Sequence, residues 1–279
     1  MIKVGEYNKL TAARMLDHGW YLTDDVENSV LLPMKWVPLS LEEGVEIEVF
    51  IYRDSEDRLI ATTMTPLLLA GQFAKVQVKD VTKIGAFVEM GVEKDLLVPF
   101  AEQVKDLDVG DECVIHMFLD NVTDRLTGST KIEKFLKTFD IPYEEGEKVN
   151  ALVYKYTDIG FKVIIENEYL GMIYHNQIFD PIRVGDSLEV YVNKLREDGK
   201  IDLLIQKPGH LSIGDSTENV LQYLKDNDGF TPINDKTAPE VIYDIFKMSK
   251  KQYKKAIGGL YKKKLIKITE EGIFLINKR

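Results

Sequence analysis

A unit the size of a small domain is repeated three times in this 279-residue chain, and the repetition constrains the fold more than any other feature. Four anchors recur in the same order: a glycine beside an apolar strand, a short apolar run, a turn with glycine, and a polar hairpin. In the order of the copies, these are Gly19, Gly85 and Gly160; VLLP, LLVP and GMIY; Gly44, Gly110 and Gly185; and hairpins starting at Glu56, Thr123 and Asp198.

Apolar and polar residues alternate inside the units, as at Val76, Val78 and Val81, and breaks that contain glycine separate the runs. This pattern predicts short strands joined by turns. A short helix over 131–138 is expected to end the second unit. The strands expected in the first unit are 9–15, 20–23, 29–33, 45–52 and 59–63.

The repeat and its punctuation predict three β domains, over residues 1–65, 66–143 and 144–209. After Gly214 the period of the apolar residues changes from that of strands to that of helices.

Beyond that point the sequence predicts three helices, over 216–227, 237–248 and a segment that runs to Lys264. Asp215 or Ser216 is the expected N-cap of the first helix, and Ser249 that of the third. The stretch LIKITEEGIFLI then predicts a hairpin. Residues 214–279 are therefore expected to form a winged helix-turn-helix domain.

Charge divides the chain at nearly the same place. The formal net charge is −10, but residues 1–215 carry −15 and residues 216–279 carry +5. A basic tail indicates contact with nucleic acid. The acidic part must bind, if it binds a polyanion, through local patches and stacking rather than a broad field.

The single cysteine, Cys113, lies in an apolar alternation and has no partner for an internal disulfide. A buried structural thiol is expected there. The amino terminus, MIKVGEYNKL, has no long apolar stretch, and no apolar run reaches the ~18 residues of a membrane span. We therefore expect a cytoplasmic protein.

The three units resemble S1-type RNA-binding domains, which are five-stranded OB-fold barrels. The middle copy carries the resemblance most clearly, in IGAFVEM, DLLVPFAEQV, VGDECVIHMFL and DRLTGS. The resemblance implies a barrel face with rings on its second and third strands and a basic residue in its last hairpin. Such a face suits single strands, because bases stack on rings and phosphates contact Arg or Lys. The expected fold class is mainly β and multidomain: three tandem S1-type OB-fold β-barrels followed by an α+β winged-helix domain.

The same resemblance assigns candidate RNA-binding residues in each copy. Phe161 lies one residue before the second-strand position of its copy and is open to a core role, because adjacent strand residues face opposite sides. A core role for the rings and a solvated role for the hairpin cations, which neighbour acids, stay open as alternatives. The candidates are Tyr21, Phe87 and Lys162 on the second strand, Tyr174 at the end of the third, and Arg58, Arg125 and Lys200 in the hairpin.

Lysines gather on the third helix expected in the tail. At about 100° per residue, several fall on one face, opposite the apolar Tyr253, Ile257 and Leu260. Residues 249–267 contain no acid, which favours nucleic-acid contact over a plain solvated face. Lysines alone contact phosphates without reading bases. The candidates are Lys250, Lys251, Lys254, Lys255 and Lys262.

Three such barrels followed by a winged helix are similar, over the full chain, to the conserved virulence factor B family of Gram-positive bacteria. That family is regarded as RNA-binding and regulatory. The resemblance implies a non-catalytic, post-transcriptional regulator that binds single-stranded RNA through several modules, with duplex nucleic acid a further partner to test at the winged helix.

Two other functions stay open from the sequence: a DNA-binding transcriptional regulator that uses the tail, and a protein-interaction scaffold suited to the acidic array. Catalysis is not expected, because no Walker loop, HExxH, GxSxG or Cys-x-x-Cys motif occurs. An S1-bearing nuclease is a more distant alternative. No cofactor, metal site or membrane contact is expected, and the oligomeric state is open, since three tandem barrels already supply multivalency.

Overall fold

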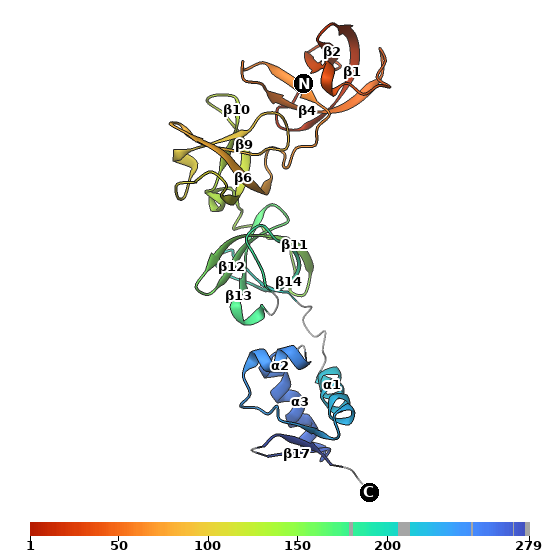
Figure 1. Cartoon of the computed structure of the whole chain (residues 1–279), viewed down its shortest axis with the longest axis vertical. Coiled ribbons are helices and arrows are strands. Elements are labelled where there is room, and N and C mark those ends of the chain that lie inside the picture. Colours follow the sequence, from red (N-terminus) through yellow and green to blue (C-terminus); the bar gives the residue numbers. More distant parts are fainter. Residues whose placement is uncertain (179–180, 206–212, 247, 270, 277–279) are drawn as a thin grey trace.

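The computed structural model describes residues 1–178, 181–205, 213–246, 248–269 and 271–276. Three β domains follow one another along the long axis of the molecule, and a helical domain lies at the carboxyl end (Figure 1). The chain order of the domains is therefore also their order in space.

The first β domain is a closed barrel whose strands are hydrogen-bonded in the order β1-β2-β3-β5-β4. The strand positions agree with the sequence prediction to within two residues at each end. They are β1 (Tyr7–Leu16), β2 (Gly19–Thr23), β3 (Ser29–Pro33), β4 (Glu46–Arg53) and β5 (Leu59–Thr62).

The third β domain is a closed barrel with the same strand order, β11-β12-β13-β15-β14. Parallel pairing of β13 with β15 closes it, as that of β3 with β5 closes the first barrel. Its strands are β11 (Lys148–Thr157), β12 (Gly160–Ile165), β13 (Tyr169–Tyr174), β14 (Ser187–Leu195) and β15 (Ile201–Leu204).

The second β domain has the same neighbours in one five-stranded sheet, β10-β9-β6-β7-β8, whose hydrogen bonding is open between β8 and β10. Side chains close this seam instead. A Cβ added to Gly128 of β10 would lie 2.8 Å from Cγ2 of Val98 in β8. The strands are β6 (Phe73–Thr82), β7 (Gly85–Val88), β8 (Leu96–Pro99), β9 (Glu112–Asp120) and β10 (Arg125–Ser129).

The repeated glycine that opens the second strand of each domain has a structural reason. Gly85 pairs with Pro99 on the next strand, and a Cβ at Gly85 would lie 2.3 Å from the carbonyl oxygen of Val98. Its φ of +148° also favours glycine. Gly19 and Gly160 approach the neighbouring strand equally closely. The glycine repeated in the sequence therefore marks the same close approach of two strands in each domain.

Apolar clusters join the β domains to one another. Phe50, Tyr52 and Ile60 of the first barrel share one cluster with residues of the second domain such as Val98. Trp20 is buried in a separate cluster inside the first barrel.

A second shared cluster lies between the second and third domains, where Phe73 and Leu136 pack with Ile164 and Leu170. At its edge the ring of His116 stacks on Phe135 with centroids 3.8 Å apart. The three β domains are thus packed into a continuous array.

Short 3-10 helices follow strands in each β domain: η1 (Met34–Trp36), η2 (Phe100–Glu102), η3 (Ile132–Phe135) and η4 (His175–Gln177). The helix expected over 131–138 is the single-turn η3, so that prediction was too long. Ile132 points into the apolar cluster and Leu136 follows in extended conformation, so burial of these two side chains limits the segment to one turn.

The C-terminal domain contains three helices and a small sheet of order β16-β18-β17, with its own apolar core. Ser249 caps α3 with a capping box completed by Gln252, as predicted for the Ser249 cap. α3 ends two residues before the expected Lys264. The elements are α1 (Ile213–Asp226), β16 (Phe230–Thr231), α2 (Pro239–Phe246), α3 (Lys250–Lys262), β17 (Ile266–Ile268) and β18 (Ile273–Leu275).

The predicted N-cap of the first helix was wrong. α1 begins at Ile213, so Asp215 and Ser216 both lie inside it. Ser216 is buried in the first turns of the helix, and its hydroxyl has no hydrogen-bond partner among the residues that the structure describes. The capping position precedes Ile213 and lies outside the described residues.

Candidate nucleic-acid interface

Phe87 and Arg125, the two candidates of the second domain, line one cavity of about 590 Å³. Phe87 lies on β7, where it pairs with Leu97 of β8, and Arg125 begins β10. The first barrel closes the cavity from the other side with Tyr52 and Arg53 of β4. The second-strand ring and the hairpin cation of this copy therefore face a common space.

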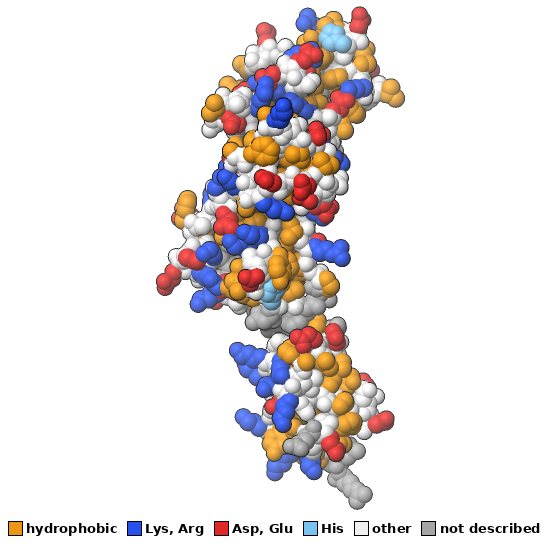
Figure 2. Space-filling view, turned by 60° about the vertical axis from the view of Figure 1, so that its left-hand side comes forward, with side chains coloured by type: hydrophobic (Ala, Val, Ile, Leu, Met, Phe, Trp, Pro, Cys, Tyr) orange, Lys and Arg blue, Asp and Glu red, His pale blue; other side chains and the backbone are white. Residues whose placement is uncertain are grey.

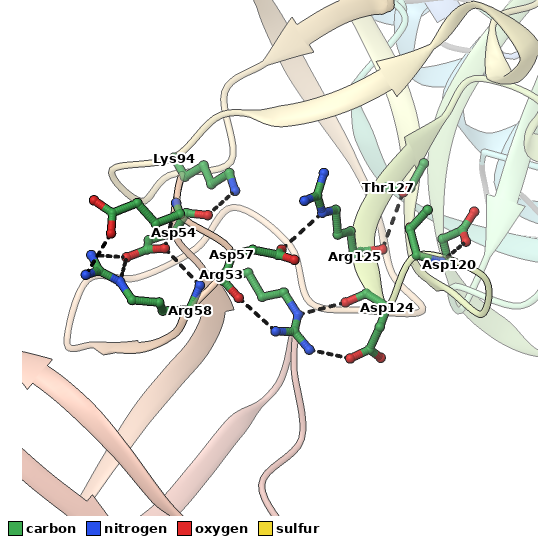
Figure 3. Close-up of polar contacts among 11 residues, drawn as sticks. Arg53, Asp54, Asp57, Arg58, Lys94, Asp120, Asp124, Arg125 and Thr127 are labelled. Carbon is green, nitrogen blue, oxygen red and sulfur yellow. Dashed lines mark hydrogen bonds and ion pairs between the residues drawn. The ribbon is translucent and has the colours of Figure 1, made fainter.

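Three cations line this cavity, and contacts across the domain junction orient each of them (Figure 3). The Nε of Arg125 donates to the Asp57 carboxylate at 3.0 Å. Arg53 donates through Nε to the backbone oxygen of Asp124 at 3.0 Å and forms an ion pair with the carboxylate of that residue. Lys94 donates to the backbone oxygen of Asp54 at 2.7 Å.

Burial and neighbouring charge alter the proton affinity of these groups. Burial lowers the pKa of Lys94, and the positive charge of Arg125 adds to that effect. The hydrogen bond from Arg125 lowers the pKa of Asp57. The pair is exposed, so a ligand phosphate can compete with Asp57 for the guanidinium.

Acids also line the cavity, but most are engaged. Glu102 forms a 2.5 Å ion pair with Lys134, and Asp120 accepts the backbone N–H groups of Val122 and Thr123. Burial raises the pKa of Asp95, the third lining carboxyl group. Two of the three carboxyl groups are thereby offset by donors, while Asp57 and Asp124 match the two arginines, so a phosphate bound here would compete with these ion pairs.

In the first barrel, Tyr21 belongs to a separate surface cluster. The guanidinium of Arg14 lies 4.9 Å from the centre of the Tyr21 ring, and the phenol oxygen is 3.3 Å from Nε2 of His18. A ring beside a cation at the surface is the arrangement on which a base can stack. Arg58 is not part of this cluster.

Arg58 instead folds back onto its own hairpin. Its guanidinium contacts the carboxylate of Asp54 at 2.7 Å and that of Glu56 at 2.9 Å. Burial would raise the pKa of Asp54, but hydrogen bonds from Arg58 outweigh it and hold that pKa low. The hairpin cation of this copy is therefore already matched by two acids.

The candidates of the third domain are dispersed and paired. Lys162 forms a 2.6 Å ion pair with Glu133 of the second domain, and Lys200 one of 2.7 Å with Asp198. The guanidinium of Arg196 lies 5.7 Å from the centre of the Tyr174 ring. Phe161 is buried in the core of the barrel, so the core role left open for it is correct.

In the C-terminal domain, α3 turns Tyr253, Ile257 and Leu260 inward, as its periodicity predicts. Figure 2 shows Lys and Arg side chains gathered along one edge of this domain. By helix geometry, the exposed lysines of α3 on the side away from Tyr253, Ile257 and Leu260 are Lys251, Lys254, Lys255 and Lys262.

Two of the α3 candidates also stabilise the domain itself. Lys250 donates to the backbone oxygen of Thr237 at 2.7 Å, and so ties the start of α3 to the segment before α2. Lys254 lies 3.9 Å from the carboxylate of Asp235. Within the described residues, the amino groups of Lys251, Lys255 and Lys262 form no ion pair or hydrogen bond, which leaves them available to phosphates.

Sequence reasoning missed Arg53, Lys94, Arg14 and Arg196. Arg53 and Lys94 join the site only because the first barrel packs on the second. Arg14 pairs with Tyr21 across β1 and β2, next to a register shift that follows Ala12, so its place beside the ring depends on how the two strands pair. Cys113, expected to be buried, is half-buried beside a cavity at the next junction, where burial raises its pKa to about 11.

Among the described residues, no group of three or more His, Cys, Asp and Glu side chains is arranged to hold a metal ion. The same part of the chain contains no helix that is both long and apolar enough to cross a bilayer.

OB-fold barrels that present rings beside cations, followed by a winged helix with a lysine-rich face, define a class of multidomain nucleic-acid-binding proteins. The comparisons agree with this class. Residues 218–275 match the CvfB-like winged helix domain, and residues 4–64 match the S1 domain. These are nucleic-acid-binding domain types that are generally non-catalytic.

The relatives confirm the resemblance predicted from the sequence. Conserved virulence factor B of Staphylococcus saprophyticus is 28% identical over 245 residues, which cover 85% of this chain and 82% of the relative. The uncharacterized protein YitL of Bacillus subtilis is 28% identical over 268 residues, 94% of this chain and 90% of that protein. A crystal structure of a multidomain protein with nucleic acid binding domains from Streptococcus pneumoniae is 25% identical, covers 98% of both chains and has a TM-score of 0.41.

Proposed function

We propose that this protein is a cytoplasmic, post-transcriptional regulator that binds single-stranded RNA through several of its domains. The observation that carries the proposal is the single cavity lined by Phe87, Arg125, Arg53 and Lys94. A ring offers its face to a base of any sequence, and the cations around it meet the adjoining phosphates.

Several weak sites on one chain support affinity through effective concentration. Once the Phe87 cavity holds one segment, the Tyr21 cluster and the lysine face of α3 are presented to the rest of the same strand. Binding at the second site is then intramolecular, which raises the overall affinity without any new contact. This mechanism requires no dimer and no broad positive field, and it is compatible with a net charge of −10.

The test is fluorescence anisotropy of the intact chain with single-stranded RNA and with duplex DNA over a salt series. Phe87→Ala should weaken RNA binding about tenfold, because stacking is worth about 1–3 kcal/mol per base. Arg125→Gln should reduce the salt dependence by about 0.7 in the log–log slope, the value for one phosphate contact on a single strand. Phe139→Ala, which removes a ring that is 65% exposed outside the cavity, is the matched control.

The α3 lysines favour one rival, a transcription factor that binds duplex DNA through the winged helix. A preference for duplex DNA that depends on Lys251, Lys255 and Lys262 and is indifferent to Phe87 would replace the RNA proposal with that one. Binding of a protein partner without measurable nucleic-acid affinity would instead establish a scaffold, to which the acidic array is suited.

A further inference from the structure

A cavity that the proposed function leaves unused lies between the second and third β domains. Its volume is about 710 Å³, and it shares no lining residue with the Phe87 cavity. The second domain contributes the segment around Lys105, the start of β9 and the η3 turn. The third domain contributes residues 154–156 of β11 and Val184.

The charges around this inter-domain cleft are unbalanced in favour of cations. Two carboxylates line it, and both are neutralised by lysines from outside the lining: Glu112 by Lys75 at 2.7 Å and Glu133 by Lys162 at 2.6 Å.

Three of the four lysines that line the cleft have no acidic partner among the described residues. Lys134 is bound to Glu102, but the amino groups of Lys105, Lys131 and Lys155 form no hydrogen bond or ion pair with any described residue, and all three side chains are exposed. Three unmatched lysines around one cleft attract an anion that carries more than one charge.

The cleft also presents a ring beside these lysines. Tyr156 is 60% exposed. Edge-on contact with Phe161 and a tilted contact with His175, both at 5.2 Å between ring centres, hold its ring in place without covering it. Ile132 and Val114 add an apolar floor. A fixed, exposed ring next to an apolar surface suits a flat aromatic group.

We propose that this cleft is a further site for single-stranded nucleic acid, with a base stacked on Tyr156 and phosphates at Lys105, Lys131 and Lys155. The inference rests on the proposed function and adds a site to it. A nucleic acid matches both features, because it alternates flat bases with phosphates. An acidic peptide would satisfy the lysines but would leave the ring unused, and it becomes an outcome of the test.

The test uses the intact chain, a fluorescent oligouridylate and a site-specific reporter. Cys113 is the only cysteine of the chain and lines this cleft, so its rate of maleimide labelling reports occupancy of this site when it is measured at alkaline pH, because burial raises the pKa of the thiol to about 11. We expect saturating oligouridylate to slow labelling at least threefold. Lys131→Gln/Lys155→Gln should weaken binding and reduce the log–log salt slope by about 1.4, for two lost phosphate contacts.

Tyr156→Ala should weaken binding about tenfold at constant salt slope, since it removes stacking without charge. The matched control is Lys9→Gln/Lys148→Gln, which removes two exposed lysines away from the cleft, one of them at the start of β11. It should leave unchanged the degree to which oligouridylate slows the labelling of Cys113.

The outcomes separate this inference from the proposed function. If RNA binds and depends on Phe87, but Cys113 labels at the same rate and the cleft variants bind like the control, the cleft is not a site and the proposed function stands. If RNA does not bind at all, both fail. Protection of Cys113 by polyglutamate as strong as that by oligouridylate would identify the cleft as an acidic-peptide site and overturn the inference.

Discussion

The guanidinium of Arg125 in the second domain donates to the carboxylate of Asp57 in the first. One residue earlier, Asp124 of the second domain accepts from Arg53 of the first. The junction thus contains two reciprocal ion pairs, in which each domain contributes one arginine and one aspartate. Asp57 and Asp124 occupy equivalent repeat positions, and both have a positive φ, of 68° and 55°.

Asp57→Asn should tighten single-stranded RNA binding by about two- to fivefold, because it frees Arg125 from an exposed ion pair and lets a phosphate take its place. Anisotropy at low and high salt measures the change, which should shrink as salt rises. Glu56→Gln, on the same hairpin but paired with Arg58, is the matched control. Weaker binding by Asp57→Asn would show that the carboxylate positions Arg125 rather than competing for it.

His116 should make the β array sensitive to mild acid. Burial, with a smaller contribution from Lys134, lowers its pKa from 6.5 to about 4. The folded state therefore keeps the imidazole neutral while the unfolded chain takes up a proton below pH 6.5. The free energy of unfolding should fall by about 3 kcal/mol from this group as the pH drops from 6.5 to 4, and the group should have no effect above that window.

Urea unfolding at several pH values measures this effect as a difference between variants, since carboxyl groups also titrate in acid. His116→Phe, which keeps a ring against Phe135, should flatten the pH dependence between 4 and 6.5. His18→Gln, which removes an exposed imidazole of the first barrel, is the control. An unchanged slope in His116→Phe would contradict the assignment.

Gly85→Ala should destabilise the second domain by about 2–4 kcal/mol, because its Cβ would collide with the backbone of β8 and the strand cannot move away without breaking the pairing. Gly110→Ala is a matched control, since it also has a positive φ but no atom lies within 4 Å of the added Cβ. It should cost only about 1–2 kcal/mol of backbone strain. Equal losses in urea unfolding would mean that the close contact relaxes.

Replacing Lys251, Lys255 and Lys262 by Gln should weaken binding to duplex and single-stranded nucleic acid alike, because these amino groups meet phosphates rather than bases. On duplex DNA the log–log salt slope should fall by about 2.7, for three contacts. Lys225→Gln/Lys236→Gln, which removes exposed lysines elsewhere in the C-terminal domain, is the control. Loss of sequence preference without a change of slope would contradict simple phosphate contact.

The order and type of the domains could be predicted from the sequence, because each barrel repeats the same glycines and the same alternation of apolar and polar residues. Gly19, Gly85 and Gly160 mark where one strand crosses close to the next, and alternation supplies the strands between them. The lysine face of α3 could also be predicted from the sequence, because the apolar Tyr253 and Leu260 mark the side of the helix that packs inward.

The contacts at the domain junctions could not be predicted from the sequence. The partners Arg53 with Asp124 and Lys162 with Glu133 are far apart in the sequence and belong to different domains. Whether these residues meet depends on how one barrel is oriented against the next, and the residue pattern within a single repeat does not determine that orientation. Both cavities lie at such junctions, so the sequence named Phe87 and Arg125 without showing what else surrounds them.

The apolar cluster that Phe50 and Tyr52 share with Val98 has a consequence for the length of RNA that the protein prefers. Two barrels joined through a shared apolar core cannot swivel independently, so the interval between their contact points is fixed by the fold, like the marks on a ruler. Affinity should then rise in steps as an oligonucleotide grows long enough to reach each successive mark.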